Sequence, residues 1–172
     1  TNLDVLSRLA SRFSPALKTV YSSISAVEEL VVGSDLVIGA VLVAGAEAPK
    51  VVTKEMVKTM KSGTVLVDVA IDQGGCFETS QATTYRDPTY VIDDVIHYCV
   101  ANMPGAVPCT STYALNNVTT PFGLAIANKG WRRALKEDRN LRNGLNVCAK
   151  MITNKAVASA LNYEYVETAS LL

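Results

Sequence analysis

The first apolar pattern along the chain has the spacing of one helix face. Its members are Leu3, Leu6, Leu9, Ala10 and Phe13. Asn2 stands before them as a candidate N-cap, and Ser14-Pro15 ends the pattern. The pattern therefore predicts a helix from residue 3 to residue 13.

Short apolar runs then alternate with further helical patterns. The runs predict strands at 17–21, 35–41, 64–70 and 95–101. One helix is predicted from a cap at Ser25 to Gly33, and another from Thr53 through Met60. The strand at 35–41 is apolar on both faces, which is typical of parallel strands covered by helices. Alternating strands and helices with short connections predict a parallel sheet with right-handed crossovers.

The pattern changes again near Pro108. A long helix with a kink at Pro121 is predicted from Thr110 to Gly130, and further helices are predicted at 131–138 and 154–161. We therefore expect an α/β fold in two parts. Residues 1–108 form part of a doubly wound parallel sheet, and residues 109–172 form a helical segment from a second lobe.

Charge and cysteine usage exclude several classes of function. Sixteen basic and sixteen acidic side chains cancel, which leaves no electrostatic basis for binding nucleic acid or an anionic membrane surface. No apolar run approaches the roughly 18 residues of a membrane span, and the first residues do not resemble a secretory signal. The four cysteines form no C-x-x-C pair and there is one histidine, so we predict no metal site and favour a reducing, intracellular setting.

Candidate chemistry gathers where the predicted strands end, because ligands of open parallel sheets bind outside the carboxyl ends of the strands. Three strands run into "AVLVAGA", "AIDQGG" and "VANMPG". Asp72, in the second of these, could orient a water or exchange a proton with a ligand, although an Asp followed by glycines is also an ordinary loop former. Gly74 and Gly75 are expected to supply positive φ or a close backbone approach.

Three other polar residues have less distinctive surroundings. His97 lies in the apolar run "VIHYCV" and is expected to be a hydrogen-bonded core residue rather than a catalytic one. Asp35 and Asp68 lie at or inside strands, where they could cap or pair locally. The chain contains no G-x-G-x-x-G, so the usual signature of a dinucleotide-binding unit is absent from these residues.

Two long segments resemble the C-terminal half of NAD-dependent alanine dehydrogenases. They are "DLVIGAVLVAGAEAPKVVTKEMVKTMKSGTVLVDVAIDQGGCFETS" and "HYCVANMPGAVPCTSTYALNNVTTPFGLAIANKG", and the similarity extends through "NLRNGLNVCAKMITNKAVASALNYEYVE". The NAD-binding component of transhydrogenase shares the "APK…MVKTMK…VDVA" frame but typically has Glu at the position of Asp72. The resemblance implies a Rossmann-type NAD domain, a substrate domain made from both chain ends and hexameric assembly. Within the intracellular setting inferred from the cysteines, the cytoplasm is the expected location.

The resemblance also implies a reaction and its site. The reaction is the reversible oxidative deamination of L-alanine to pyruvate and ammonium, with NAD as the hydride acceptor. Asp72 matches the family's catalytic aspartate beside the nicotinamide. The positions that match cofactor-lining residues are Ser22, Val41, Leu42, Val69, Ala70, Ile71, Asp72, Val100, Ala101, Asn102 and Met103.

Several features of the family have no match in these residues. The substrate-binding arginine and lysine, the catalytic histidine and the phosphate-binding glycine loop belong to the N-terminal half. Val5, Gln81 and Cys109 stand where the family typically has basic residues. We therefore expect this chain to function only together with an N-terminal half. Two alternatives are a degenerate remnant that serves as a structural or assembly subunit, and the NAD-binding component of a transhydrogenase.

Overall fold

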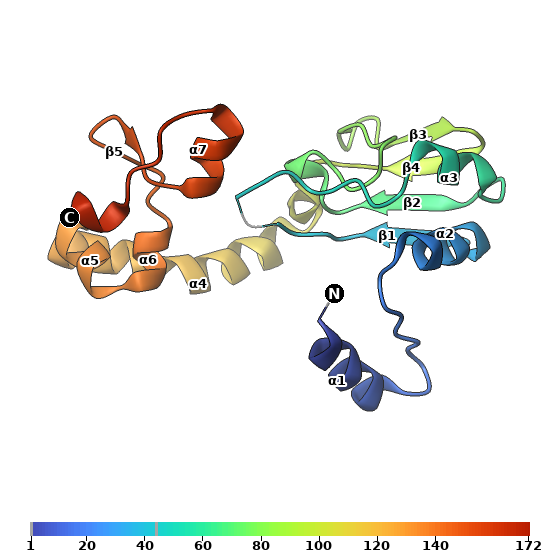
Figure 1. The fold of residues 1–172 in the computed structure, drawn as a ribbon, viewed down its shortest axis with the longest axis horizontal. Coiled ribbons are helices and arrows are strands. Elements are labelled where there is room, and N and C mark those ends of the chain that lie inside the picture. Colours follow the sequence, from blue (N-terminus) through green and yellow to red (C-terminus); the bar gives the residue numbers. More distant parts are fainter. Residues whose placement is uncertain (1, 44) are drawn as a thin grey trace. The chain divides into compact units, whose positions relative to one another are not determined.

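The computed structural model describes residues 2–43 and 45–172, which divide into two units. Unit 1 consists of Thr1–Leu42 and Glu47–Ala101, and unit 2 consists of Val43–Ala46 and Asn102–Leu172. The boundary expected near Pro108 falls inside unit 2. Figure 1 shows the elements of both units.

The described residues of unit 1 form three α-helices, whose N-termini are capped by side chains. In α1 (Leu3–Phe13), the Asn2 side chain accepts hydrogen bonds from two amides, as predicted. The helix α3 (Lys54–Thr59) is capped by Thr53, which was also predicted. The helix α2 (Ile24–Gly33) begins earlier than expected, because Ser23 rather than Ser25 accepts the hydrogen bond from the Ala26 amide.

The sheet of unit 1 has the strand order β1-β2-β4-β3 (Figure 1). The strands β1 (Leu36–Gly39), β2 (Val65–Asp68) and β4 (Val95–Tyr98) are parallel, which confirms the predicted α/β fold with a mostly parallel sheet. The prediction of a strand at 17–21 is wrong. This segment belongs to no strand, because no strand of the described residues forms a ladder with it.

One strand was not predicted. The strand β3 (Thr89–Ile92) pairs antiparallel with β4, so the sheet is not wholly parallel. Asp93 and Asp94 connect the two strands, and both have positive φ, as two-residue hairpins of type I′ require. The sequence hid this turn because the usual signal is Asn-Gly or Asp-Gly rather than Asp-Asp.

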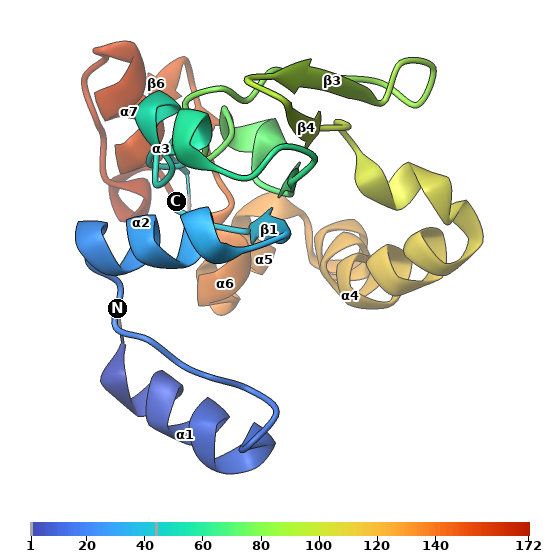
Figure 2. The ribbon, with the colours of Figure 1, turned by 90° about the vertical axis from the view of Figure 1, so that its right-hand side faces the viewer.

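The helices α2 and α3 cover the same face of the sheet (Figure 2). Val31 from α2 and Val57 from α3 belong to one buried cluster with Leu66 of β2 and Val95 of β4. Side chains alternate along each strand, so the residues between these point to the other face. On β1 that other face is left open within unit 1, since its outward side chains are more than half exposed: Leu36 is 54% and Ile38 is 61% exposed.

Unit 2 is mainly helical. From Asn102 onward, its first elements are the 3-10 helix η2 (Met103–Ala106) and the long helix α4 (Pro108–Lys129), which starts two residues before the predicted one and contains Pro121. The helix α5 (Trp131–Glu137) and the helix α7 (Lys155–Leu161) confirm two predictions. The remaining elements were not predicted: α6 (Arg139–Asn143), the hairpin of β5 (Val147–Cys148) and β6 (Met151–Ile152), and η3 (Thr168–Ser170). Among the described residues, no helix combines the length and apolar character needed to cross a membrane.

Candidate functional site

The carboxyl ends of β1 and β2 lie side by side and border a hollow. Gly39 and Asp68 are in register at these ends, and the Val69 amide donates to the Gly39 carbonyl at 2.8 Å. The hollow has a volume of about 230 Å³. It is lined by Ala40, Val41, Leu42, Val69, Ala70, Asp72 and Gln73. Its place in the sheet is the one where open α/β folds bind ligands.

Asp72 reaches this hollow from a single 3-10 turn, η1 (Ile71–Gln73). Ile71 is buried beneath the turn, whereas Asp72 is exposed. Gly74 (φ 85°) and Gly75 (φ 76°) then reverse the chain, which confirms that both glycines supply positive φ. Gly75 also makes a close approach, because a Cβ atom built on it would lie 2.7 Å from Oδ2 of Asp68.

The carboxylate of Asp68 is fully buried at the base of the same loop. Its Oδ1 accepts from the Ala70 amide at 2.9 Å, and its Oδ2 accepts from the amides of Cys76 at 2.8 Å and Phe77 at 3.4 Å. The Ser80 hydroxyl also donates to Oδ2. This confirms that Asp68 pairs locally, and the donors come from both ends of the segment that carries Asp72.

The thiol of Cys76 lies against this carboxylate, at 3.5 Å from Oδ1. Burial raises the pKa of Cys76 to about 11, and the charge of Asp68 and its hydrogen bond act in the same direction. The thiol therefore stays protonated at neutral pH and is a poor nucleophile, since the thiolate is the reactive form.

Residues 48–51 hold the opposite side of the loop through its carbonyl groups. The Lys50 ammonium donates to the carbonyls of Gly74 at 2.5 Å and Gly75 at 2.8 Å. The Ala48 amide donates to the Gln73 carbonyl at 2.9 Å, and the Val51 amide donates to the Cys76 carbonyl at 2.7 Å. The loop is thus bonded along its length rather than only at its ends.

His97 is a core residue, as expected, and lies outside the hollow. Its Nδ1–H donates to the Val95 carbonyl at 3.0 Å, so the neutral ring accepts at Nε2 from the Thr79 hydroxyl at 2.7 Å. The ring stacks on Tyr90 at a centroid distance of 4.9 Å. Burial lowers the pKa of His97, and the hydrogen bond to Val95 only partly opposes this shift.

The structure brings together some of the residues expected at the site and separates others. Those that line the hollow are Val41, Leu42, Val69, Ala70 and Asp72. Ile71 lies buried beneath them, and Val100 is fully buried. Ser22 is exposed in the segment before α2, and Ala101 is exposed at the end of unit 1. Asn102 and Met103 belong to unit 2, so their position relative to the hollow stays a prediction.

Sequence reasoning missed two lining residues, Ala40 and Gln73. Both are direct neighbours of expected residues, and the strand-end argument applied to them equally. Gln73 carries a buried side-chain oxygen, Oε1, that has no hydrogen-bond partner within the described part of the chain.

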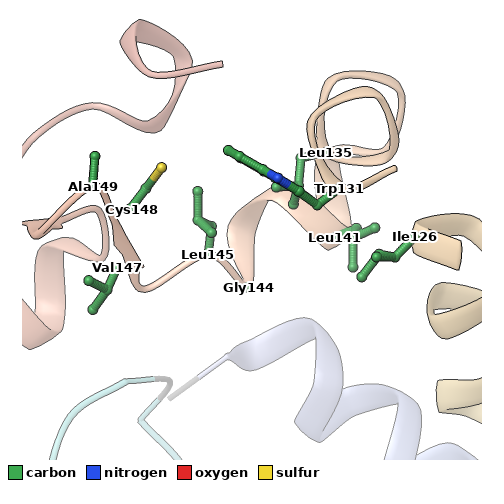
Figure 3. Close-up of a pocket in the computed structure, with 9 residues that line it drawn as sticks. All are labelled: Ile126, Trp131, Leu135, Leu141, Gly144, Leu145, Val147, Cys148 and Ala149. Carbon is green, nitrogen blue, oxygen red and sulfur yellow. The ribbon is translucent and has the colours of Figure 1, made fainter. Parts of the chain in front are cut away.

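A second hollow, of about 510 Å³, lies within unit 2 (Figure 3). Its lining consists of Ile126, Trp131, Leu135, Leu141, Gly144, Leu145, Val147, Cys148 and Ala149. These side chains offer no carboxylate, base or cation, so the larger hollow is a weaker candidate for catalysis. Residues 2–43 and 45–172 contain no cluster of three or more His, Cys, Asp or Glu side chains that could hold a metal ion.

Comparison with known proteins identifies relatives over nearly the whole chain. The chain is 59% identical to an alanine dehydrogenase of Halomonas elongata over 167 residues, which cover 97% of this chain and 45% of the relative. It is 52% identical to alanine dehydrogenase 2 of Staphylococcus aureus over 170 residues, 96% of this chain and 46% of the relative. The chain therefore spans about half the length of these relatives.

Solved structures agree with the sequence comparison. An L-alanine dehydrogenase superposes with a TM-score of 0.80 at 45% identity, over 94% of this chain and 44% of the other. A transhydrogenase from Sinorhizobium meliloti is more distant, with a TM-score of 0.50 at 32% identity over 58% of this chain and 29% of the other. The family model described as "Alanine dehydrogenase/PNT, C-terminal domain" matches residues 1–155. The chain therefore belongs to the alanine dehydrogenase/PNT C-terminal domain family.

Proposed function

We propose that this chain is the C-terminal portion of an NAD-dependent alanine dehydrogenase, which interconverts L-alanine and pyruvate plus ammonium. Unit 1 would be the NAD-binding part, and unit 2 would contribute to the substrate domain. One observation carries the proposal: an exposed aspartate, Asp72, stands at a hollow formed by the carboxyl ends of two parallel strands. The high identity to named alanine dehydrogenases supports the same reaction.

The hollow fits one flat part of a dinucleotide. Its volume of about 230 Å³ is below the roughly 300–1,000 Å³ of sites that enclose a whole small molecule. Ala40 and Ala70 leave the backbone accessible, while Leu42 and Val69 provide apolar surface for a ring. Bound NAD would supply a hydride acceptor here, and its phosphates would need residues beyond those that line this hollow.

Asp72 would exchange protons with the substrate and orient the attacking water. Oxidation of alanine to pyruvate transfers a hydride from Cα to NAD and replaces the bond from Cα to nitrogen by a carbonyl whose oxygen comes from water, so that ammonium and a proton are released. A carboxylate at the rim can accept a proton and orient the attacking water, and such general acid–base catalysis contributes about 100- to 10,000-fold in rate. Ile71, directly before Asp72, is buried and anchors the turn that carries this carboxylate.

The proposal also predicts a partner for the open sheet face. Leu36 and Ile38 expose most of their apolar surface on β1, the edge strand of the sheet. An unpaired edge and an apolar face are both surfaces that proteins normally cover. We infer that an N-terminal half of the alanine dehydrogenase subunit covers them, and that complete subunits assemble into a homo-oligomer.

A chimera tests the function. The matching segment of the Halomonas elongata relative is replaced by this chain, and NADH formation from L-alanine and NAD is followed optically. We expect turnover by the chimera, a loss of about 100-fold or more in Asp72→Asn, and little change in Asp87→Asn, which alters an exposed aspartate of unit 1 outside the lining of the hollow.

The 172-residue chain itself should bind NAD weakly in calorimetry and should not turn over alanine. An inactive chimera that retains the circular dichroism of a folded protein would contradict the proposal. That result would instead favour the assembly-subunit alternative.

A further inference from the structure

We propose that Asp68 and Lys50 are positioning residues that hold Asp72 at the rim of the hollow. This inference rests on the proposed function, since it concerns the same site. Neither residue lines the hollow, and neither side chain bonds to Asp72 in the described structure. Both act on the backbone of the loop between β2 and Cys76, from opposite sides.

The burial of the Asp68 carboxylate is favourable only in a loop conformation that supplies its hydrogen-bond donors. A buried charge is costly unless hydrogen bonds replace its water. Here the replacement donors include the amides of Ala70 and Cys76, which precede and follow the turn that carries Asp72. If the loop took another path, these donors would leave and the carboxylate would be buried without partners. The loop conformation and the solvation of Asp68 are therefore coupled.

Lys50 holds the same loop through its acceptors. The positive φ of Gly74 and Gly75 accompanies a geometry in which both carbonyls reach one ammonium, at 2.5 Å and 2.8 Å. Hydrogen bonds to a charged group are about twice as strong as neutral ones. Backbone N–H groups of the loop thus bond to the Asp68 carboxylate, and backbone carbonyls of the loop bond to the Lys50 ammonium. The backbone of the loop is therefore held by two opposite charges.

The contacts converge on the segment that carries Asp72. Ala70 lies two residues before Asp72, and Gly74 lies two residues after it. At the turn of Asp93 and Asp94 between β3 and β4, in the same unit, the bond from outside the hairpin is instead between backbone groups, since the Gly63 amide donates to the Asp94 carbonyl at 2.8 Å. A displacement of a catalytic group by about 1 Å can lower a rate by about 100-fold, so a loop held in this way matters for Asp72.

The experiment uses the chimera described above. Asp68→Asn keeps the size of the side chain but must place an NH₂ group against backbone N–H donors, because both oxygens accept from amides. We expect kcat to fall by about 30- to 100-fold, while KM for NAD changes less than about threefold. Lys50→Met, at an exposed lysine, should lower kcat by about 5-fold or more, and Lys50→Arg should recover most of that loss.

Leu66→Ala is the matched control for lost stability. Leu66 is fully buried on β2, two residues before Asp68, in the core cluster, and takes part in none of the hydrogen bonds by which Lys50 and Asp68 hold the loop. Its truncation should destabilise the protein but leave kcat within about twofold below the melting temperature. The acid limb of the kcat–pH profile should shift in Asp68→Asn and Lys50→Met and stay in place in Leu66→Ala.

The possible outcomes separate the two proposals. An unsubstituted chimera without activity refutes the proposed function. An active chimera in which Lys50→Met leaves both kcat and the pH profile unchanged refutes the positioning role alone. If Asp68→Asn does not fold, the Lys50 variants decide the matter, because loss of kcat in Lys50→Met with recovery in Lys50→Arg supports the inference and equal kcat in all three proteins overturns it.

Discussion

Replacing Gly75 by alanine should destabilise unit 1 through two separable effects. The first is backbone strain, because Gly75 has φ 76°. A residue with a Cβ atom in this region is strained by about 1–2 kcal/mol. The second is a collision, because the new Cβ would lie 2.7 Å from both Oδ2 of Asp68 and Cβ of Ser80.

The collision cannot be relieved cheaply. Oδ2 of Asp68 is not the free end of a side chain, since the amides of Cys76 and Phe77 and the Ser80 hydroxyl bond to it. Moving it weakens at least one hydrogen bond to a buried charge, which contributes about 1.5–3 kcal/mol. We therefore expect Gly75→Ala to lower the free energy of unfolding by about 2.5–5 kcal/mol, which is the sum of the strain and the weakened hydrogen bond.

Gly63→Ala measures the strain by itself. Gly63 has φ 82°, but no atom lies within 4 Å of the position where its Cβ would be. Its substitution should destabilise by about 1–2 kcal/mol only. The difference between the two variants isolates the close approach of Gly75 to Asp68.

Hydrogen exchange of the sheet is the appropriate assay. Trp131 belongs to unit 2, so tryptophan fluorescence would not report on the sheet. Exchange of the amides in peptides covering β2 and β4 gives the free energy of opening of unit 1 directly. Equal destabilisation in Gly75→Ala and Gly63→Ala would refute the reasoning. It would mean that the Asp68 side chain can move away from the new methyl group without weakening its hydrogen bonds.

Three further predictions follow from buried groups and one helix end. Burial in the folded chain lowers the pKa of His97 below its value in the unfolded chain. Unfolding therefore takes up a proton, and the unfolding free energy should fall as pH drops below about 6.5. Measuring the unfolding free energy as a function of pH should show this dependence, and His97→Gln should weaken it. Iodoacetamide at about pH 8 should label the exposed Cys109 in the native chain, whereas the buried Cys76 should react only after unfolding, as peptide mass spectrometry can show. Gly33→Ala should raise the unfolding free energy by up to about 1 kcal/mol in denaturant titrations, because Gly33 ends α2 with no atom within 4 Å of its Cβ position.

Local signals in the sequence predicted most elements of unit 1. Asn2 and Thr53 precede helical patterns as caps, and the apolar runs of β1, β2 and β4 are too regular to be loops. The errors have long-range causes. The run at 17–21 has strand propensity, but no strand of the sheet lies beside it. The strand β3 depends on a turn formed by Asp93 and Asp94, and residue propensity alone does not indicate that these two aspartates have positive φ.

The candidate site was predictable in part for the same reason. Asp72 could be placed at a strand end because "VLVDVA" is recognisable as a buried strand. The role of Asp68 could not, because its partners at Cys76, Phe77 and Ser80 are brought to it only when Gly74 and Gly75 reverse the chain. The signal in the sequence that points to Asp68 is a carboxylate inside a buried strand, followed by two adjacent glycines.

The order of the two units along the chain has a consequence for biosynthesis. Val43, Gly45 and Ala46 belong to unit 2, although the residues on both sides of them belong to unit 1. A Cβ on Gly45 would lie 3.1 Å from Cβ of Ala156, so this short segment packs beside α7. During synthesis this segment leaves the ribosome long before α7 does. It can therefore pack beside α7 only after the strands β2, β3 and β4, which follow it in the sequence, have been synthesised. The units are interleaved rather than consecutive, so neither can be transferred to another protein by a single cut in its gene.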